Sequence, residues 1–175
     1  AYMAPMAFPF YDDMGFSKAQ IAWVIKIFGV AATIGGTLVG GLVVSRLGII
    51  RSLVIGGILQ GLSNLVFVIQ AYAGHNLYVL VGCISVENIS GGLGTAAFVA
   101  YLSSLCNVAY TATQYALLSS FMSLARDIFA ATSGFLAAAV SWTAFFVITA
   151  LLSVPGLLVL WYLIKVQAFK SRQTL

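Results

Sequence analysis

Four ionisable residues interrupt otherwise apolar stretches of this sequence: Lys26, Glu87, Arg126 and Asp127. An ionised side chain deep in a membrane costs at least a few kcal/mol, so it normally faces a cavity or a charged partner. Each of the four lies roughly nine to eleven residues from the outer end of its predicted helix, which is about 13–17 Å at the rise of an α-helix. Three helices therefore place charge at one level, near the middle of a bilayer.

Polar and aromatic residues continue from each charge at intervals of three and four, which places each set on one helix face. Aromatic rings beside hydrogen-bonding groups and fixed charges suit a sugar ligand that bears carboxylates. An ion-pair network that only joins the helices is the alternative, with Asp127 paired to Arg126 or Lys26. The three stripes are Trp23, Lys26, Val30, Thr33 and Thr37; Glu87, Gly91, Gly94, Phe98 and Tyr101, with Asn88 and Thr95 beside them; and Tyr115, Ser119, Met122 and Arg126.

Arg126 offers a guanidinium fork that matches a carboxylate. Lys26 would hold a second carboxylate or keep Glu87 ionised, and Glu87 is then an ion-pair partner or a group that exchanges a proton. No metal-ligand cluster and no nucleophile beside a base stands out, so we predict neither an enzyme nor a cofactor. The predicted substrate-binding residues are Arg126, Lys26, Glu87, Asn88, Tyr115 and Trp23, and the predicted coupling or ion-pair residues are Glu87 and Asp127.

The composition shows why these charges are exceptional. Apolar residues make up 62% of the 175 and charged residues 7%, and the mean hydropathy is +1.07, whereas a soluble domain carries about 25% charged residues. The net charge of +4 forms no basic face, which argues against nucleic-acid binding. Cys83 and Cys106 lie on one predicted helix, about 35 Å apart, too far for a disulfide.

The chain reads as one all-α, polytopic membrane helix bundle over residues 1–175. Ser17 and Gln20 form a predicted capping box, and Asn76 and Ser141 are predicted N-caps. We expect the helices with internal charges to line a pathway and the other two to face lipid. A truncated helix remnant at residues 1–11 precedes helices at about 17–44, 50–71, 77–105, 112–137 and 142–165, with a cytoplasmic tail at 166–175.

Two repeated glycine pairs, Gly36-x-x-x-Gly40 and Gly57-x-x-x-Gly61, predict close helix packing. Lys and Arg in the short loops predict the orientation, because such loops are cytoplasmic when they are basic. The C-terminus is then inside, which matches the second half of a twelve-helix transporter in a bacterial inner membrane. The cytoplasmic side would hold Arg46, Arg51, Lys165, Lys170 and Arg172, and the outer side Asp12, Asp13, Lys18 and His75.

Two stretches carry a family resemblance. The turn Gly41-Leu-Val-Val-Ser-Arg46-Leu-Gly48-Ile-Ile-Arg51 resembles the cytoplasmic loop signature of the major facilitator superfamily, except that Ser45 stands where the family usually has Asp. Residues 87–107 and 110–120, with residues 13–21 and Lys26, closely resemble the AmpG-type muropeptide permeases. The resemblance covers essentially the whole chain, aligned with the second half of that family.

This resemblance implies proton-coupled import of anhydro-muropeptides (N-acetylglucosaminyl-anhydromuramic acid, with or without peptide) for cell-wall recycling. It also implies a link to β-lactamase induction. The partners expected for the chain are then the muropeptide ligand, protons, the lipid bilayer and the missing N-terminal half of the same transporter. A major facilitator carrier for another acidic solute, such as an acyl-CoA or a sugar acid, is one alternative. A non-transporting membrane scaffold, whose internal charges only pair helices, is the other.

Overall fold

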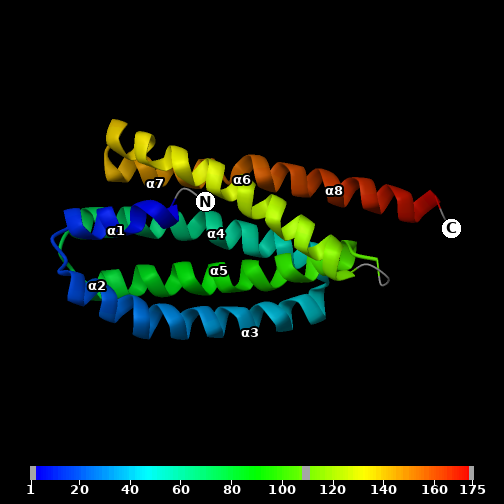
Figure 1. Cartoon of the computed structure of the whole chain (residues 1–175), viewed down its shortest axis with the longest axis horizontal. Coiled ribbons are helices and arrows are strands. Elements are labelled where there is room, and N and C mark those ends of the chain that lie inside the picture. The colour runs from blue at the N-terminus through cyan, green and yellow to red at the C-terminus, as the bar shows by residue number, and fades with distance from the viewer. Residues whose placement is uncertain (1–2, 108–110, 174–175) are drawn as a thin grey trace.

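The computed structural model describes residues 3–107 and 111–173, with side chains up to residue 165, and in these residues every regular element is a helix. The helices run lengthwise beside one another (Figure 1). This confirms the all-α helix bundle. The elements are α1 (Met3–Asp13), α2 (Lys18–Val24), the π-helix η1 (Ile25–Gly29), α3 (Val30–Leu47), α4 (Ile49–Ala73), α5 (Leu77–Leu105), α6 (Thr111–Ala139), α7 (Trp142–Leu151) and α8 (Val154–Gln173).

The predicted helix starts are confirmed by their capping bonds. The Gln20 backbone N–H donates to Ser17 Oγ at 3.2 Å, and the Ser17 N–H donates to Gln20 Oε1 at 2.9 Å. Asn76 Oδ1 accepts from two backbone N–H groups of α5, and Ser141 Oγ accepts from the Ala144 N–H of α7 at 3.4 Å. These side chains satisfy N–H groups that a helix start leaves without partners.

Several helix ends differ from the prediction. α1 continues to Asp13, and α3 continues to Leu47, so the single residue Gly48, with φ +82°, separates α3 from α4. A positive φ suits glycine because it has no Cβ. α8 continues to Gln173, so the backbone of residues 166–173 of the predicted tail is helical, while the side chains of Lys170 and Arg172 lie outside the described residues.

The predicted span over 142–165 corresponds to one segment long and apolar enough to cross a membrane, Trp142–Lys165, and a two-residue turn divides it into α7, which ends at Leu151, and α8, which begins at Val154. Pro155 explains the break: it has no N–H to donate, and its ring clashes with the carbonyl four residues earlier, which belongs to Leu151. A second irregularity, the π-helix η1, lies within the predicted helix 17–44 and holds Lys26.

Four described helical segments are long and apolar enough to cross a membrane: Lys18–Leu47, Ile49–Ala73, Leu77–Leu105 and Trp142–Lys165. α6 is not among these four, although it has 29 residues. Its many Ser and Thr residues and the Arg126-Asp127 pair lower its hydropathy. The chain is a multi-pass membrane helix bundle in which the predicted span 112–137, now α6, is the most polar.

Glycines bring α3 and α5 into backbone contact. A Cβ on Gly36 would collide with the backbone of Ile89, and a Cβ on Gly92 would lie 2.6 Å from the Thr33 carbonyl oxygen. The second predicted pair packs against the C-terminal region, since a Cβ on Gly57 would lie 2.9 Å from Leu157 Cδ2 and one on Gly61 would lie 2.6 Å from Ser153 Oγ. The predicted packing role of both pairs is confirmed.

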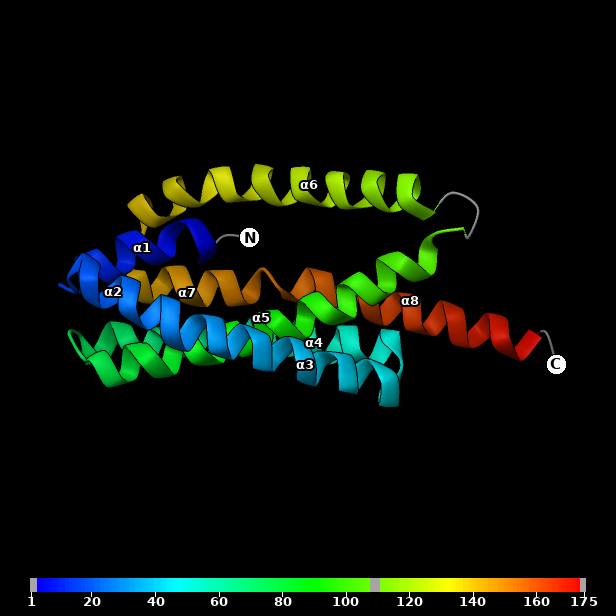
Figure 2. The ribbon, with the colours of Figure 1, turned by 60° about the horizontal axis from the view of Figure 1, so that its bottom comes forward.

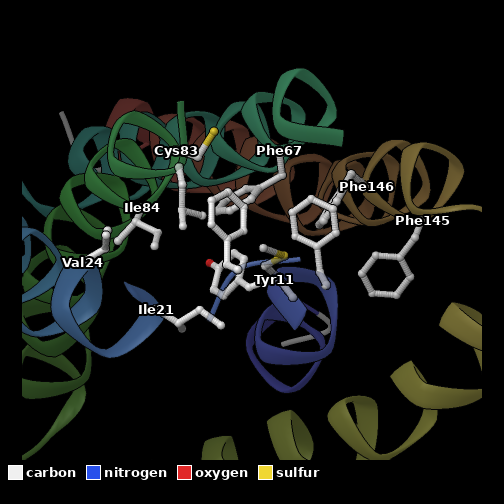
Figure 3. Close-up of a cluster of buried hydrophobic side chains, with 12 residues drawn as sticks. Tyr11, Ile21, Val24, Phe67, Cys83, Ile84, Phe145 and Phe146 are labelled. Atoms are coloured by element: carbon white, nitrogen blue, oxygen red, sulfur yellow. The ribbon is translucent and has the colours of Figure 1, made fainter. Parts of the chain in front are cut away.

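Buried apolar side chains gather at the end of the bundle that carries the turns before α2, α5 and α7 (Figure 3). Phe10 of α1 meets Phe146 of α7 with ring centroids 4.8 Å apart, and Phe67 of α4 contacts both rings. At the surface of this end, Trp142 Nε1 donates to Asp13 Oδ2 at 2.8 Å. Packing therefore closes this end of the bundle.

Cys83 and Cys106 are both free, as expected from their spacing along one helix.

Candidate functional site

A cavity of about 680 Å³ lies midway along the bundle, below the buried aromatic cluster. It reaches from α3, α4 and α5 to α6, which runs along the other side of α1 (Figure 2). The cavity thus joins the tightly packed helices to the most polar helix. Its polar lining consists of Thr33 and Thr37 of α3, Gln60 and Asn64 of α4, Glu87, Asn88 and Thr95 of α5, Arg126 of α6, Thr149 of α7, and Ser153.

Three of the predicted site residues meet in this cavity: Glu87, Asn88 and Arg126. They come from α5 and α6, and the sequence placed Glu87 and Arg126 at the same depth. Among the described residues that line the cavity, Arg126 is the only cation and Glu87 the only carboxylate. The cavity therefore offers one permanently charged cation, Arg126, and one acidic group, Glu87, about midway along the bundle.

The structure does not bring Trp23, Lys26 or Tyr115 to the cavity lining. Trp23 is half exposed and its ring packs edge-on against Phe28, with centroids 5.5 Å apart. Lys26 is exposed on η1. Because a π-helix has a wider turn than an α-helix, η1 changes the angular position of Trp23 and Lys26 relative to Thr33 and Thr37, which do line the cavity. Ligand binding by these three residues stays a prediction.

Arg126 and Asp127 form an ion pair, with Nε and Oδ1 3.7 Å apart, and both side chains are more than half exposed. It is the only ion pair among the residues the structure describes, so Glu87 does not pair with Lys26 or Arg126 at that distance. An exposed pair of this kind contributes only about 0–1 kcal/mol. Because a guanidinium has five N–H donors, Arg126 retains donors for a ligand carboxylate.

Asn88 is held in place by hydrogen bonds from two sides. Its Nδ2 donates to the Ile84 carbonyl at 2.7 Å, and its Oδ1 lies 2.9 Å from the Thr33 hydroxyl of α3. The same hydroxyl lies 2.8 Å from the carbonyl of Gly29, the last residue of η1. Thr33 therefore links the π-helix to the α5 wall of the cavity.

Sequence reasoning missed the polar residues contributed by α4 and the α7–α8 region: Gln60, Asn64, Thr149 and Ser153. The expectation that these two segments face only lipid is therefore wrong. A neutral amide or hydroxyl in a membrane helix is less conspicuous than a charge, because it costs less to bury. The available signal was the spacing of Gln60 and Asn64, which puts two amides on one face beside Gly57 and Gly61.

The predicted loop motif lies far from this cavity, at the opposite end of the bundle from the aromatic cluster. Gly41 and Arg46 belong to the last turns of α3, Gly48 makes the positive-φ connection, and Arg51 lies in the first turn of α4. Both arginine side chains are exposed. Within the described residues, no group of three His, Cys, Asp or Glu side chains is placed to hold a metal ion.

Comparisons with known proteins agree with the resemblance found in the sequence. The pattern of the Major Facilitator Superfamily matches residues 1–174. The chain is 38% identical over 163 residues to "Putative transporter AmpG 4" of Rickettsia conorii, which covers 93% of this chain and 39% of that protein. It is 39% identical over 147 residues to "Anhydromuropeptide permease" of Escherichia coli (strain K12), with 84% and 30% covered. The chain thus spans well under half the length of these relatives.

Proposed function

The chain belongs to the major facilitator superfamily, and from this premise we propose that it forms the C-terminal half of a proton-coupled permease that imports anhydro-muropeptides into the cytoplasm. The observation that carries the proposal is the mid-depth cavity in which Arg126 stands among neutral hydrogen-bonding side chains. The relative from Escherichia coli carries this substrate in its name. The proposed substrate joins sugar hydroxyls and amides to carboxylates, and the cavity offers partners for both kinds of group.

The position of the cavity suits secondary transport. Substrate sites in such transporters lie near the bilayer midplane, at the interface between two structural repeats. Arg126 supports carboxylate binding because a guanidinium makes two parallel hydrogen bonds to that group. Glu87 also lines the cavity and is our candidate for the group that exchanges a proton. Among the described residues that line the cavity, it is the only carboxylate.

The C-terminal half is assigned from the sequence resemblance, and two observations support the chain being part of a longer transporter. The chain spans only 30–39% of the length of its relatives, and α6 has a single buried residue, Ser133, which leaves the rest of its surface for lipid or for another part of a longer transporter. We propose an inner-membrane location with a cytoplasmic C-terminus, because Arg46 and Arg51 lie at the end of the bundle opposite Asp12 and Asp13.

The decisive experiment expresses the full-length parent in cells that lack their own muropeptide permease. We expect uptake of labelled N-acetylglucosaminyl-anhydromuramyl peptide, and we expect a protonophore to abolish it. An excess of an acyl-CoA or of a sugar acid should not compete. Competition by either solute would favour the carrier for another acidic solute, and absence of uptake for every solute at normal abundance would favour the scaffold.

A further inference from the structure

We propose that the side-chain amide of Gln60, together with the Thr95 hydroxyl, forms a sugar subsite on the α4–α5 wall of the cavity, which binds hydroxyl and acetamido groups of the transported ligand. The subsite rests on the proposed function, because it assigns the uncharged part of the same ligand to one wall. Gln60 is then a specificity-determining residue, and it comes from α4, a helix that the sequence predicted to face only lipid.

Glycine contacts show how α4 and α5 lie against each other. A Cβ on Gly56 would lie 2.9 Å from the Gly94 Cα, and a Cβ on Gly91 would lie 3.4 Å from Gln60 Oε1. Gly91 therefore has no side chain at the point where the Gln60 amide reaches α5. Since Gln60 and Gly91 both line the cavity, the amide from α4 lies beside a bare stretch of α5 on the cavity wall.

Three residues of α5 continue this wall. Glu87, Gly91 and Thr95 follow one another at intervals of four, so they lie on one helix face, and all three line the cavity. Each interval is about 6 Å along the helix axis, so the three positions span about 12 Å. The Gln60 amide lies at the middle position, where α5 has no side chain. Carboxylate, amide and hydroxyl thus form a polar row of about the length of a disaccharide.

The Gln60 amide is available to a ligand. The one described hydrogen bond of this side chain, from Nε2 to Ser63 Oγ, stays within α4 and is long at 3.3 Å. The side chain is only partly buried, and its Oε1 keeps accessible surface, whereas Asn64 Oδ1 is enclosed without a partner among the described residues. Thr95 is exposed, and its hydroxyl has no hydrogen-bond partner in the described part of the chain. An amide and a hydroxyl can each donate and accept, as sugar recognition requires.

The other neutral polar groups of the cavity are more engaged or less accessible. Asn88 is bonded through both its amide atoms, and Asn64 is only 9% exposed, so its Nδ2 adds a donor at the edge of the cavity. Four hydroxyls already donate their single proton to a backbone carbonyl three or four residues earlier, at 2.6–3.0 Å. These are the hydroxyls of Thr33, Thr37, Thr149 and Ser153.

α6 supplies different chemistry to the same cavity. Arg126 and Phe129 are three residues apart, so they share a helix face, and both line the cavity. A guanidinium suits the carboxylate of the ligand, and an aromatic ring suits the apolar face of a sugar ring. Ligand pockets commonly combine apolar contact with a few polar groups that fix orientation. The sugar is thus held at its polar edge by the α4–α5 wall, while its carboxylate is left to Arg126.

The test measures KM for uptake by the full-length parent with two probes: N-acetylglucosaminyl-anhydromuramic acid, and the same disaccharide with its peptide. Gln60→Met keeps the length of the side chain but removes the amide. At equal membrane abundance it should raise KM for both probes by the same factor, about two- to tenfold, the effect of losing one neutral hydrogen bond. Thr95→Val should raise KM for both probes in the same way. If Gln60→Met does not accumulate, Gln60→Ala should show the same increase.

Ser63→Ala is the matched control. It removes the one described partner of the Gln60 side chain, but Ser63 does not line the cavity. KM for both probes should therefore stay unchanged. An increase equal to that of Gln60→Met would overturn the subsite, because the effect of Gln60 would then come from the structure of α4.

The remaining outcomes separate the two proposals. An unchanged KM in the Gln60 variants or in Thr95→Val, with normal uptake by the unaltered parent, would overturn the subsite and leave the proposed function standing. An increase confined to the probe with peptide would also overturn it, because Gln60 would then contact the peptide. Failure of the unaltered parent to take up either probe would overturn the proposed function itself, and the subsite with it.

Discussion

α5 and α6 face the same cavity and have the same length of 29 residues, but they are held in very different ways. α5 buries side chains along its whole length, from Leu80 to Leu102, and its Gly92 packs against the backbone of α3. α6 buries only Ser133 within this chain. It packs mainly beside α1, on the side of the molecule away from α3 (Figure 2).

This difference separates two ways of presenting a polar group in a membrane protein. On α5, Asn88 is fixed by hydrogen bonds before any ligand arrives. On α6, Arg126 is exposed and its ion pair with Asp127 is a weak restraint. We infer that α5 supplies a rigid wall and α6 an adaptable one, and the variants below, made in the full-length parent, test that division.

The largest effect is expected where α3 meets α5. Gly36→Ala places a Cβ against the backbone of Ile89, so the two helices must separate. Overpacking of this kind costs about 1–3 kcal/mol, and we expect a lower melting temperature and less protein in the membrane. Gly35→Ala is the control, because its Cβ would meet nothing within 4 Å. Equal losses in both variants would show that this close contact does not stabilise the bundle.

The next effect concerns the adaptable wall. Arg126→Ala should raise KM for the anhydro-muropeptide about tenfold or more, because a hydrogen bond to a charged group contributes about 1.5–3 kcal/mol. Abundance and melting temperature should stay nearly unchanged, since the side chain is 61% exposed. A large loss of folded protein with normal KM would instead assign Arg126 to structure.

Residue types predicted the rigid part of the molecule better than the site. Caps at Ser17, Asn76 and Ser141 and the paired glycines are local signals, and all of them correspond to the contacts that were expected. The break before Pro155 also has a local cause and was foreseeable. The face that Lys26 presents was not, because the π-helix depends on how the whole segment packs. Asn64 escaped notice because a neutral amide resembles many others in helices of this kind.

A moderate effect is expected from the bond that joins α3 to α5. Thr33→Val keeps the shape of the side chain but removes the hydroxyl beside Asn88 Oδ1. We expect a loss of about 0.5–1.5 kcal/mol in stability and a smaller increase in KM than for Arg126→Ala. Thr37→Val is the control, because Thr37 also lines the cavity and its one described hydrogen bond is to the Thr33 carbonyl of its own helix. We compare the melting temperature and KM of the two variants. Equal shifts in Thr33→Val and Thr37→Val would show that the bond between Thr33 and Asn88 has no particular importance.

The smallest effect is expected from Asp127→Asn. Its carboxylate is 69% exposed and does not line the cavity, and its one described ion pair, with Arg126, spans 3.7 Å. An exposed pair contributes about 0–1 kcal/mol, so stability, KM and the dependence of uptake on external pH should change little.

Glu87→Gln is the variant to compare with it, because Glu87 lines the same cavity as Arg126. This substitution should alter the pH dependence of uptake if Glu87 exchanges the coupling proton. Uptake that stays proton-coupled in Asp127→Asn but not in Glu87→Gln would place coupling on the rigid wall. The reverse result would transfer it to α6 and break the division between the two helices.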